Sequence, residues 1–143
     1  EKYEEDEIIV AASSSHPLAR KKKVEVEELL KEPWIIREEG SGTQMAVEKA
    51  LRKKGKSLRQ FNVVMEMGST SSVKEGAKAR LGLAFLSARA TEEEVRQASL
   101  SRIDVEGFEP ISRQIYIVFH RRRTLSPMGL AFLRFLKSGK EKP

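Results

Sequence analysis

Three short stretches of hydroxyl residues and glycine follow apolar runs, at points where a strand would give way to a turn or a helix. They are Ser13-Ser14, Ser41-Gly42-Thr43 and Gly68-Ser69-Thr70. Hydroxyls and glycines at a helix N-terminus can bind a carboxylate, phosphate or sulfate, because free backbone N–H groups and the positive end of the helix dipole meet there. Each serine or threonine alone could simply cap its own helix. Several such ends in one sheet favour a shared small-molecule site.

The elements that would position these residues alternate between strand and helix. Apolar runs predict strands over residues 8–12, 33–37, 61–67, 82–86, 101–105 and 113–120. Apolar residues at helical spacing predict helices over residues 43–54, about 73–79, 91–98 and from 126 onward. Ser41 with Gln44 and Thr91 with Glu94 have the spacing of capping boxes. Because parallel neighbours need a helical crossover, this order predicts an α/β fold with a mainly parallel sheet flanked by helices.

Composition narrows the class of protein. A chain of 143 residues with 39% apolar and 34% charged residues fits one globular domain, or one and a small piece of another. It has no cysteine, which excludes a disulfide scaffold, a cysteine zinc site and a thiol nucleophile. The longest apolar run, residues 81–86, is far shorter than the roughly 18–20 residues that span a bilayer, and the start is acidic. We therefore expect a cytoplasmic protein with no export signal and no membrane partner.

Catalytic and metal-binding patterns are sparse. The two histidines, His16 and His120, lie far apart in the sequence, and the chain has neither a metal-ligand cluster nor a nucleophile elbow. We expect no enzymatic activity, no metal and no cofactor. The net charge is +6, with basic clusters at 20–23, 52–56 and 121–123. They favour a solvated surface, and phosphate contact with nucleic acid is the alternative.

Four motifs stand in one order over nearly all of the chain. They are Glu7 to Ala19, Glu32 to Thr43, Glu66 to Thr70 with Leu81 to Leu86, and Tyr116 to Pro127 with Phe132-Leu133. Together they resemble the effector-binding region of LysR-type transcriptional regulators of bacteria. Within that family the sequence looks closest to the regulators of carbon fixation and sulfur assimilation.

The resemblance implies two α/β lobes similar to periplasmic binding proteins, with a small effector in the cleft between them. On that pattern, residues 1–14 form a crossing strand from the first lobe and residues 15–107 form the second lobe. Residues 108–143 return to the first lobe and supply its last strand and helix. We expect a fragment that lacks the family's N-terminal helix-turn-helix, so that DNA binding and a dimer or tetramer belong to the full-length protein.

The resemblance also assigns roles to the hydroxyl residues. Ser41, Gly42 and Thr43 would cap the helix that faces the cleft. The next strand end would line the cleft with Gly68, Ser69 and Thr70, whereas Ser13 and Ser14 would sit at the hinge. All eight are expected to bind the effector, whose binding would shift the population between two lobe arrangements.

One departure from the family concerns charge. Many relatives have arginine after the Gly-Ser-Gly-Thr stretch, whereas this chain has Gln44, so Arg37 is the candidate cation for an anionic effector. A solute-binding protein of a transport system shares the fold and stays as the alternative.

Overall fold

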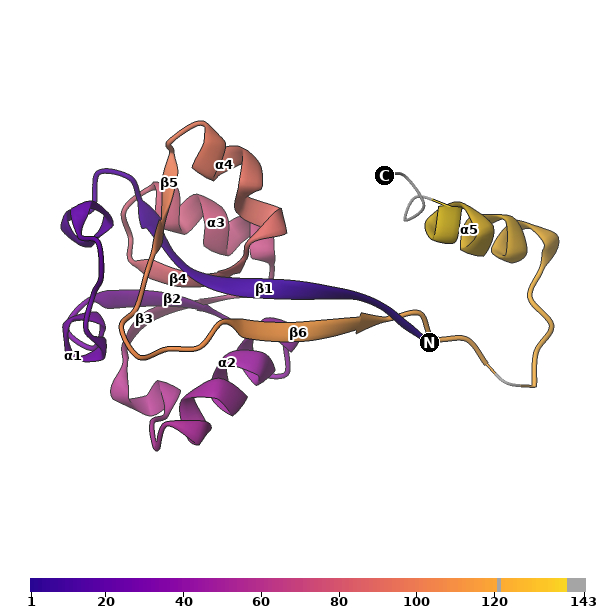
Figure 1. The fold of residues 1–143 in the computed structure, drawn as a ribbon, viewed down its shortest axis with the longest axis horizontal. Coiled ribbons are helices and arrows are strands. Elements are labelled where there is room, and N and C mark those ends of the chain that lie inside the picture. The colour runs from indigo at the N-terminus through magenta and orange to yellow at the C-terminus, as the bar shows by residue number, and fades with distance from the viewer. Residues whose placement is uncertain (121, 139–143) are drawn as a thin grey trace.

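The computed structural model in Figure 1 describes residues 1–120 and 122–138, so that Arg121 of the third basic cluster lies outside it. The strands are β1 (Lys2–Ser13), β2 (Pro33–Arg37), β3 (Asn62–Met67), β4 (Leu83–Ser87), β5 (Leu100–Ile103) and β6 (Ile111–Tyr116). The helices are α1 (Val26–Leu29), α2 (Gly42–Lys53), α3 (Thr70–Lys78), α4 (Glu92–Arg96) and α5 (Pro127–Ser138). Short 3-10 turns cover Pro17–Arg20, Leu58–Gln60 and Arg89–Thr91.

The sheet is mixed. Its order is β3-β2-β4-β1-β5, with β6 paired to the outer half of β1. Strand β2 runs parallel to β3 and β4, whereas β1 runs antiparallel to β4, β5 and β6. The expected α/β class is confirmed, and its parallel part is limited to β3-β2-β4, because β1 enters that group from the edge where the other strands end. The carboxyl end of β1 therefore lies at the opposite edge from those of β2, β3 and β4.

Two apolar layers cover the two faces of this sheet, as the alternation of strand side chains requires. Along β1, Ile8, Val10 and Ala12 pack into the layer that holds Val47 and Leu51 of α2. The intervening Ile9 and Ala11 pack with Val73 and Ala77 of α3 on the other face. Figure 1 shows α2 on one side of the sheet and α3 with α4 on the other.

Trp34 is the centre of the α2 layer. Its ring stacks on Phe85 at a centroid distance of 4.5 Å and meets the edge of Phe61 at 5.1 Å. Its indole N–H donates to the Leu29 carbonyl at 2.8 Å, which holds α1 against β2. Gly82 is required beside it, because a Cβ there would stand 2.6 Å from the Pro33 carbonyl oxygen.

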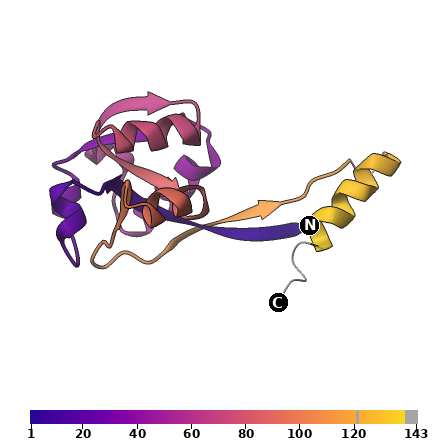
Figure 2. The same ribbon diagram turned by 90° about the horizontal axis from the view of Figure 1, so that it is seen from above.

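A two-stranded ribbon leaves the lobe on one side. It consists of β6 and the first half of β1, which pair from Lys2 and Tyr116 to Ile8 and Ile111. Figures 1 and 2 both show this ribbon extending away from the sheet, with α5 beyond it. The expected strand over residues 113–120 ends at Tyr116, because its partner β1 begins at Lys2.

Helix α5 contacts the ribbon through few polar groups. The Tyr3 hydroxyl donates to the Leu136 carbonyl at 3.4 Å, and the Lys137 ammonium pairs with the Glu1 carboxylate at 2.9 Å. Met128, Phe132 and Phe135 on the helix are exposed. An apolar helix face of this size is typical of a surface that packs against another part of a protein.

Candidate functional site

The first half of the candidate site is the N-terminus of α2. Ser41 is its N-cap, and the Ser41 hydroxyl accepts a hydrogen bond from the backbone N–H of Gln44 at 3.2 Å. The Gln44 side chain donates to Glu48 instead of closing a capping box, so only half of that predicted motif forms. Gly42 is the first residue of the helix, and Thr43 follows it with a buried side chain.

The second half is the N-terminus of α3. The Ser69 hydroxyl caps this helix by accepting from the backbone N–H of Ser72 at 3.0 Å. Thr70 is the first helical residue, and its hydroxyl oxygen accepts from Arg37 Nη1 at 2.8 Å. Gly68 precedes the cap, and no other atom lies near the position that a Cβ would take there. Of the predicted residues at this strand end, Thr70 therefore contacts a cation from β2.

The parallel strands bring these two helix ends to one edge of the sheet. Strands β2, β3 and β4 end there at Arg37, Met67 and Ser87, and the Glu38 backbone N–H donates to the Met67 carbonyl at 3.2 Å. Arg37 and Thr43 line the same small hollow between β2 and α2. The sequence prediction that these two groups of hydroxyls share one edge agrees with the structure.

Ser13 and Ser14 do not join that group, and their predicted place beside it is wrong. Ser13 pairs with Leu100 at the start of β5, and the Ser14 hydroxyl accepts from the Ser101 hydroxyl at 2.9 Å. Because β1 runs antiparallel to β4, its carboxyl end lies beside the amino end of β4. These serines hold a turn at the far edge of the sheet.

A polar network that the sequence analysis missed connects the same edge to the ribbon. Arg113 of β6 stands opposite Asp6 of β1, and its Nε donates to Asp6 Oδ2 at 2.9 Å. Asp6 Oδ1 accepts from the Ser87 hydroxyl at 2.8 Å, and Arg113 Nη1 donates to Thr43 Oγ1 at 2.9 Å. Asp6 is only 2% exposed and Thr43 only 4%.

The residues around Asp6 and Arg113 form no local sequence pattern that would predict their contact. Asp6 is one of only two aspartates, but it stands in a run of acidic residues, and Arg113 lies 107 positions away. Only the register of β1 against β6 shows that the two face each other. A cross-strand pair of this kind cannot be read from spacing, since the connection between the strands is most of the chain.

Arg37 is the second cation at this edge of the sheet, and it forms an ion pair with Glu38. Arg37 Nε and Nη2 donate to the two Glu38 carboxylate oxygens, both at 2.7 Å. These hydrogen bonds lower the pKa of Glu38 and raise the pKa of Arg37, so both groups stay ionised at neutral pH. The charge of Arg37 is thus partly balanced within the protein, whereas its Nη1 reaches Thr70.

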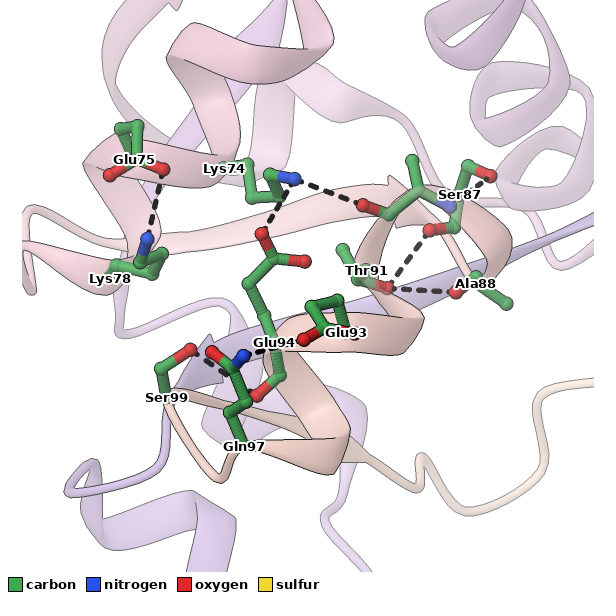
Figure 3. Close-up of polar contacts among 11 residues, drawn as sticks. Lys74, Glu75, Lys78, Ser87, Ala88, Thr91, Glu93, Glu94, Gln97 and Ser99 are labelled. Carbon is green, nitrogen blue, oxygen red and sulfur yellow. Dashed lines mark hydrogen bonds and ion pairs between the residues drawn. The ribbon is translucent and has the colours of Figure 1, made fainter.

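The segment after β4 is held by a separate polar cluster, shown in Figure 3. Thr91 donates to the Ser87 and Ala88 carbonyls at 2.9 and 3.1 Å and does not cap α4, so the second predicted capping box is wrong. The reason is that the 3-10 turn Arg89–Thr91 continues directly into α4, so that Thr91 lies within a continuous helical segment and not at its start. The Glu94 carboxylate pairs instead with the Lys74 ammonium of α3 at 2.6 Å.

Two of the basic clusters are partly neutralised by α1. Lys21 pairs with Glu28, and Lys56 pairs with Glu27 at 3.6 Å. Within residues 1–120 and 122–138, no group of three or more metal-ligating side chains is present. In the same residues, no helix is both long and apolar enough to cross a bilayer.

Known proteins similar to this chain are regulators. The family described as LysR substrate binding domain matches residues 2–140. The HTH-type transcriptional activator CmpR of Synechocystis is 37% identical over 92% of the chain and 42% of its own length. The RuBisCO operon transcriptional regulator of Allochromatium vinosum is 36% identical over 96% of the chain and 44% of its own length. The chain thus spans less than half of each of these relatives.

Solved structures show the same fold. The regulatory domain of CcmR from Synechocystis, solved in complex with 2-PG, is 27% identical and has a TM-score of 0.81. The alignment covers 99% of this chain and 66% of that one. The effector binding domain of QuiR, solved with shikimate, has a TM-score of 0.77 at 15% identity, over 98% of this chain and 64% of that one. The second likeness concerns the fold alone.

The Lys74–Glu94 ion pair makes the stability of the protein depend on pH. The hydrogen bond from Lys74 holds the pKa of Glu94 below its ordinary 4.5. A lowered folded-state pKa stabilises the protein above pH 4.5, and this contribution is lost as the pH falls through the folded value. We expect Lys74→Met to lower the free energy of unfolding by about 1 kcal/mol at pH 7, and the difference from wild type to shrink toward pH 3.

Urea unfolding at both pH values measures this effect. Arg96→Met is the matched control, since it breaks the exposed Arg96–Glu93 pair on the neighbouring turn of α4. The control should change the free energy of unfolding by about 0.5 kcal/mol or less. A Lys74→Met deficit that stays constant between pH 7 and pH 3 would show that the Glu94 carboxylate does not carry the effect.

Proposed function

The chain belongs to the LysR substrate-binding-domain family, and from that premise we propose that it is the effector-sensing part of a cytoplasmic transcriptional regulator. The observation that carries the proposal is that two helix N-termini lie at the same sheet edge, each with a threonine hydroxyl hydrogen-bonded by an arginine. The site has donors for a ligand but no catalytic arrangement, so its role is to bind and report. The relatives named above are regulators, which favours this role over that of a transport solute-binding protein.

The effector is a small oxyanion on this proposal. Thr43 and Thr70 each accept an N–H from an arginine, so each hydroxyl has its own proton left to donate. The first backbone N–H groups of α2 and α3 add donors and a positive dipole end. Carboxylate or phosphate oxygens, which only accept hydrogen bonds, fit such a site. Arg113 and Arg37 take the place of the cation that Gln44 does not supply.

The related CcmR regulatory domain, solved with 2-PG, directs the choice of probe. We use 2-PG, inorganic phosphate and sulfate as the first ligands to test. The proposal does not require that the effector of this chain be the same compound.

The division of the chain into parts follows the ribbon. On this proposal, residues 1–14 are a crossing strand from a first lobe, residues 15–107 are the second lobe, and residues 108–143 return to the first lobe. The second half of β1, from Ile8, pairs with β4 and β5 in the sheet of the second lobe. The apolar face of α5 supports this division, since Met128, Phe132 and Phe135 need a covering surface. About a third of the matched CcmR domain lies outside the alignment with this chain. The corresponding first-lobe segment is the proposed covering surface.

Binding then acts by population shift. An effector between the lobes favours the arrangement in which both lobes contact it, and the ribbon transmits the change to the rest of the regulator. DNA binding is assigned to a helix-turn-helix in the remainder of the full-length protein.

The direct test of the site is the affinity for 2-PG of hydroxyl variants. We expect Thr70→Val and Thr43→Val each to raise the Kd by about tenfold, because a hydrogen bond to a charged group is lost. Ser14→Ala is the control, since Ser14 lies at the opposite edge of the sheet. Isothermal titration calorimetry on folded variants measures all three.

The proposed site is wrong if Ser14→Ala weakens binding as much as the threonine variants do. Thermal unfolding of each variant without ligand separates a loss of affinity from a loss of structure. In the full-length regulator, the threonine variants should lose effector response and keep DNA binding.

Self-association is a further part of the proposal. Strand β3 is one edge of the sheet, and its consecutive residues Val63, Val64 and Met65 are 39–49% exposed. An exposed apolar edge strand is a template for a second chain, and β3 has no charged residue at these three positions. We propose that a second copy of the protein covers β3, which makes the regulator a homo-oligomer.

Sedimentation equilibrium tests this contact. We expect Val64→Glu to raise the dissociation constant of the oligomer by at least about tenfold, because a carboxylate would be buried at the contact. Val95→Glu introduces the same change at a similarly exposed position of α4 and should have no effect. A wild-type protein that stays monomeric over a wide concentration range would contradict the proposal.

A further inference from the structure

The Asp6–Arg113 pair lies where the ribbon leaves the lobe. Ile8 is the first residue of β1 that pairs with β4, and it is also the last that pairs with β6. Asp6 is two positions further out along the ribbon, yet its carboxylate is 2% exposed and bonded back to Ser87 at the end of β4. The pair therefore fastens the base of the ribbon to the lobe.

Arg113 connects this base to the candidate site. Its guanidinium binds Asp6 Oδ2 through Nε at 2.9 Å and Nη2 at 2.8 Å, and Nη1 extends to Thr43 Oγ1 at 2.9 Å. The Gly42 backbone comes so close that a Cβ there would stand 3.7 Å from Nη1. One rigid planar group thus bridges β1, β6 and the first turn of α2.

We propose that Arg113 is a positioning residue that couples occupancy of the effector site to the orientation of the β1–β6 ribbon through the Thr43 hydroxyl. This inference rests on the proposed oxyanion site. Arg113 occupies a lone pair of Thr43 Oγ1, which leaves the Thr43 proton to donate to the ligand. Asp6 and Ser87 hold Arg113 in the orientation that this requires.

The coupling has a definite sign. When the Thr43 hydroxyl donates to an anion, its oxygen becomes a stronger acceptor, because hydrogen bonds in series polarise one another. The Arg113–Thr43 bond then tightens, which ties β6 more firmly to α2. By reciprocity, a ribbon held in this orientation binds the anion more tightly. The ribbon is thus the element whose motion reports ligand binding.

The neighbouring Arg102–Glu7 pair provides a matched control. Arg102 of β5 donates from Nη1 to Glu7 Oε2 at 3.0 Å, one residue from Asp6 on the same strand. The side chains of Arg102 and Glu7 are 45% and 34% exposed, and the bonds of Arg102 go to Glu7 and Asp104 and not to α2. Arg102→Gln therefore removes the same charge from a partner of the same stretch of β1 without touching Thr43.

The experiment combines 2-PG affinity with hydrogen exchange of the protein. In wild type, saturating 2-PG should slow amide exchange in both the helix ends (42–44 and 70–72) and the ribbon (2–7 and 112–116). Arg113→Gln should raise the Kd by about tenfold and, at saturation, keep protection at the α3 end while losing it in the ribbon. Arg113→Lys keeps the charge without the planar fork and should lie between the two. Arg102→Gln should behave as wild type.

Thr43 variants keep the test decisive if Arg113→Gln unfolds because it leaves Asp6 buried without its partner. Thr43→Val leaves the ion pair intact and should abolish ribbon protection, and Thr43→Ser, which keeps the hydroxyl, should restore it. Wild-type affinity and wild-type ribbon protection in Arg113→Gln would overturn the coupling and leave the oxyanion site standing, and so would wild-type ribbon protection at saturation in a Thr43→Val variant whose 2-PG affinity has fallen. Equal losses in Arg102→Gln would overturn it as well. No 2-PG binding and no protection of the helix ends in wild type would overturn the proposed site, and the coupling with it.

Discussion

The structure depends on strand β1, which belongs both to the sheet of the lobe and to the ribbon. Strand β1 pairs with β4 and β5 in its second half and with β6 in its first half, so that its twelve residues run from the ribbon into the centre of the lobe. Its direction is antiparallel to the strands it meets, which places Asp6 and Glu7 at the edge where β2, β3 and β4 end. Any tilt of the ribbon relative to the lobe must pass through this strand, at the edge that carries the candidate site.

The buried carboxylate of Asp6 fixes the positions of its partner side chains at that edge of the sheet. A carboxylate as buried as that of Asp6 is tolerated only when its oxygens are bonded, and here Ser87 and Arg113 bond both of them. The same arginine spans the distance to Thr43, and Arg37 makes the corresponding bond to Thr70. The two threonines are therefore set by cations that come from other strands, while Ser41 and Ser69 cap the helices themselves. Because the two threonine oxygens accept hydrogen bonds from arginines, their hydroxyl protons stay available to donate to an oxyanion.

The sequence predicts what local patterns control and misses what register controls. The strand over 33–37 and the cap at Ser41 follow from neighbouring residues, and the structure contains them. The direction of β1 does not, because the apolar run of residues 8–12 looks the same in a parallel or an antiparallel strand. Ser13 and Ser14 were misplaced for that reason, and Arg113 was missed for a related one: its partner Asp6 is known only from the pairing of two distant strands. Thr91 shows a second limit of local patterns. The Thr91–Glu94 spacing fits a capping box, but the turn before α4 continues into the helix, and the Thr91 side chain makes no capping hydrogen bond.

The proposed oxyanion site lies at the N-termini of α2 and α3 on this edge of the sheet. Amide chemical shifts recorded by NMR during a titration with inorganic phosphate test it most directly, since they report on each backbone N–H. We expect the largest shifts at Gly42 to Gln44 and Thr70 to Ser72, with small shifts at Ser13 to Ser15. Shifts that are largest at Ser13 to Ser15, or that are confined to the lysines and arginines of residues 20–23 and 52–56, would contradict it.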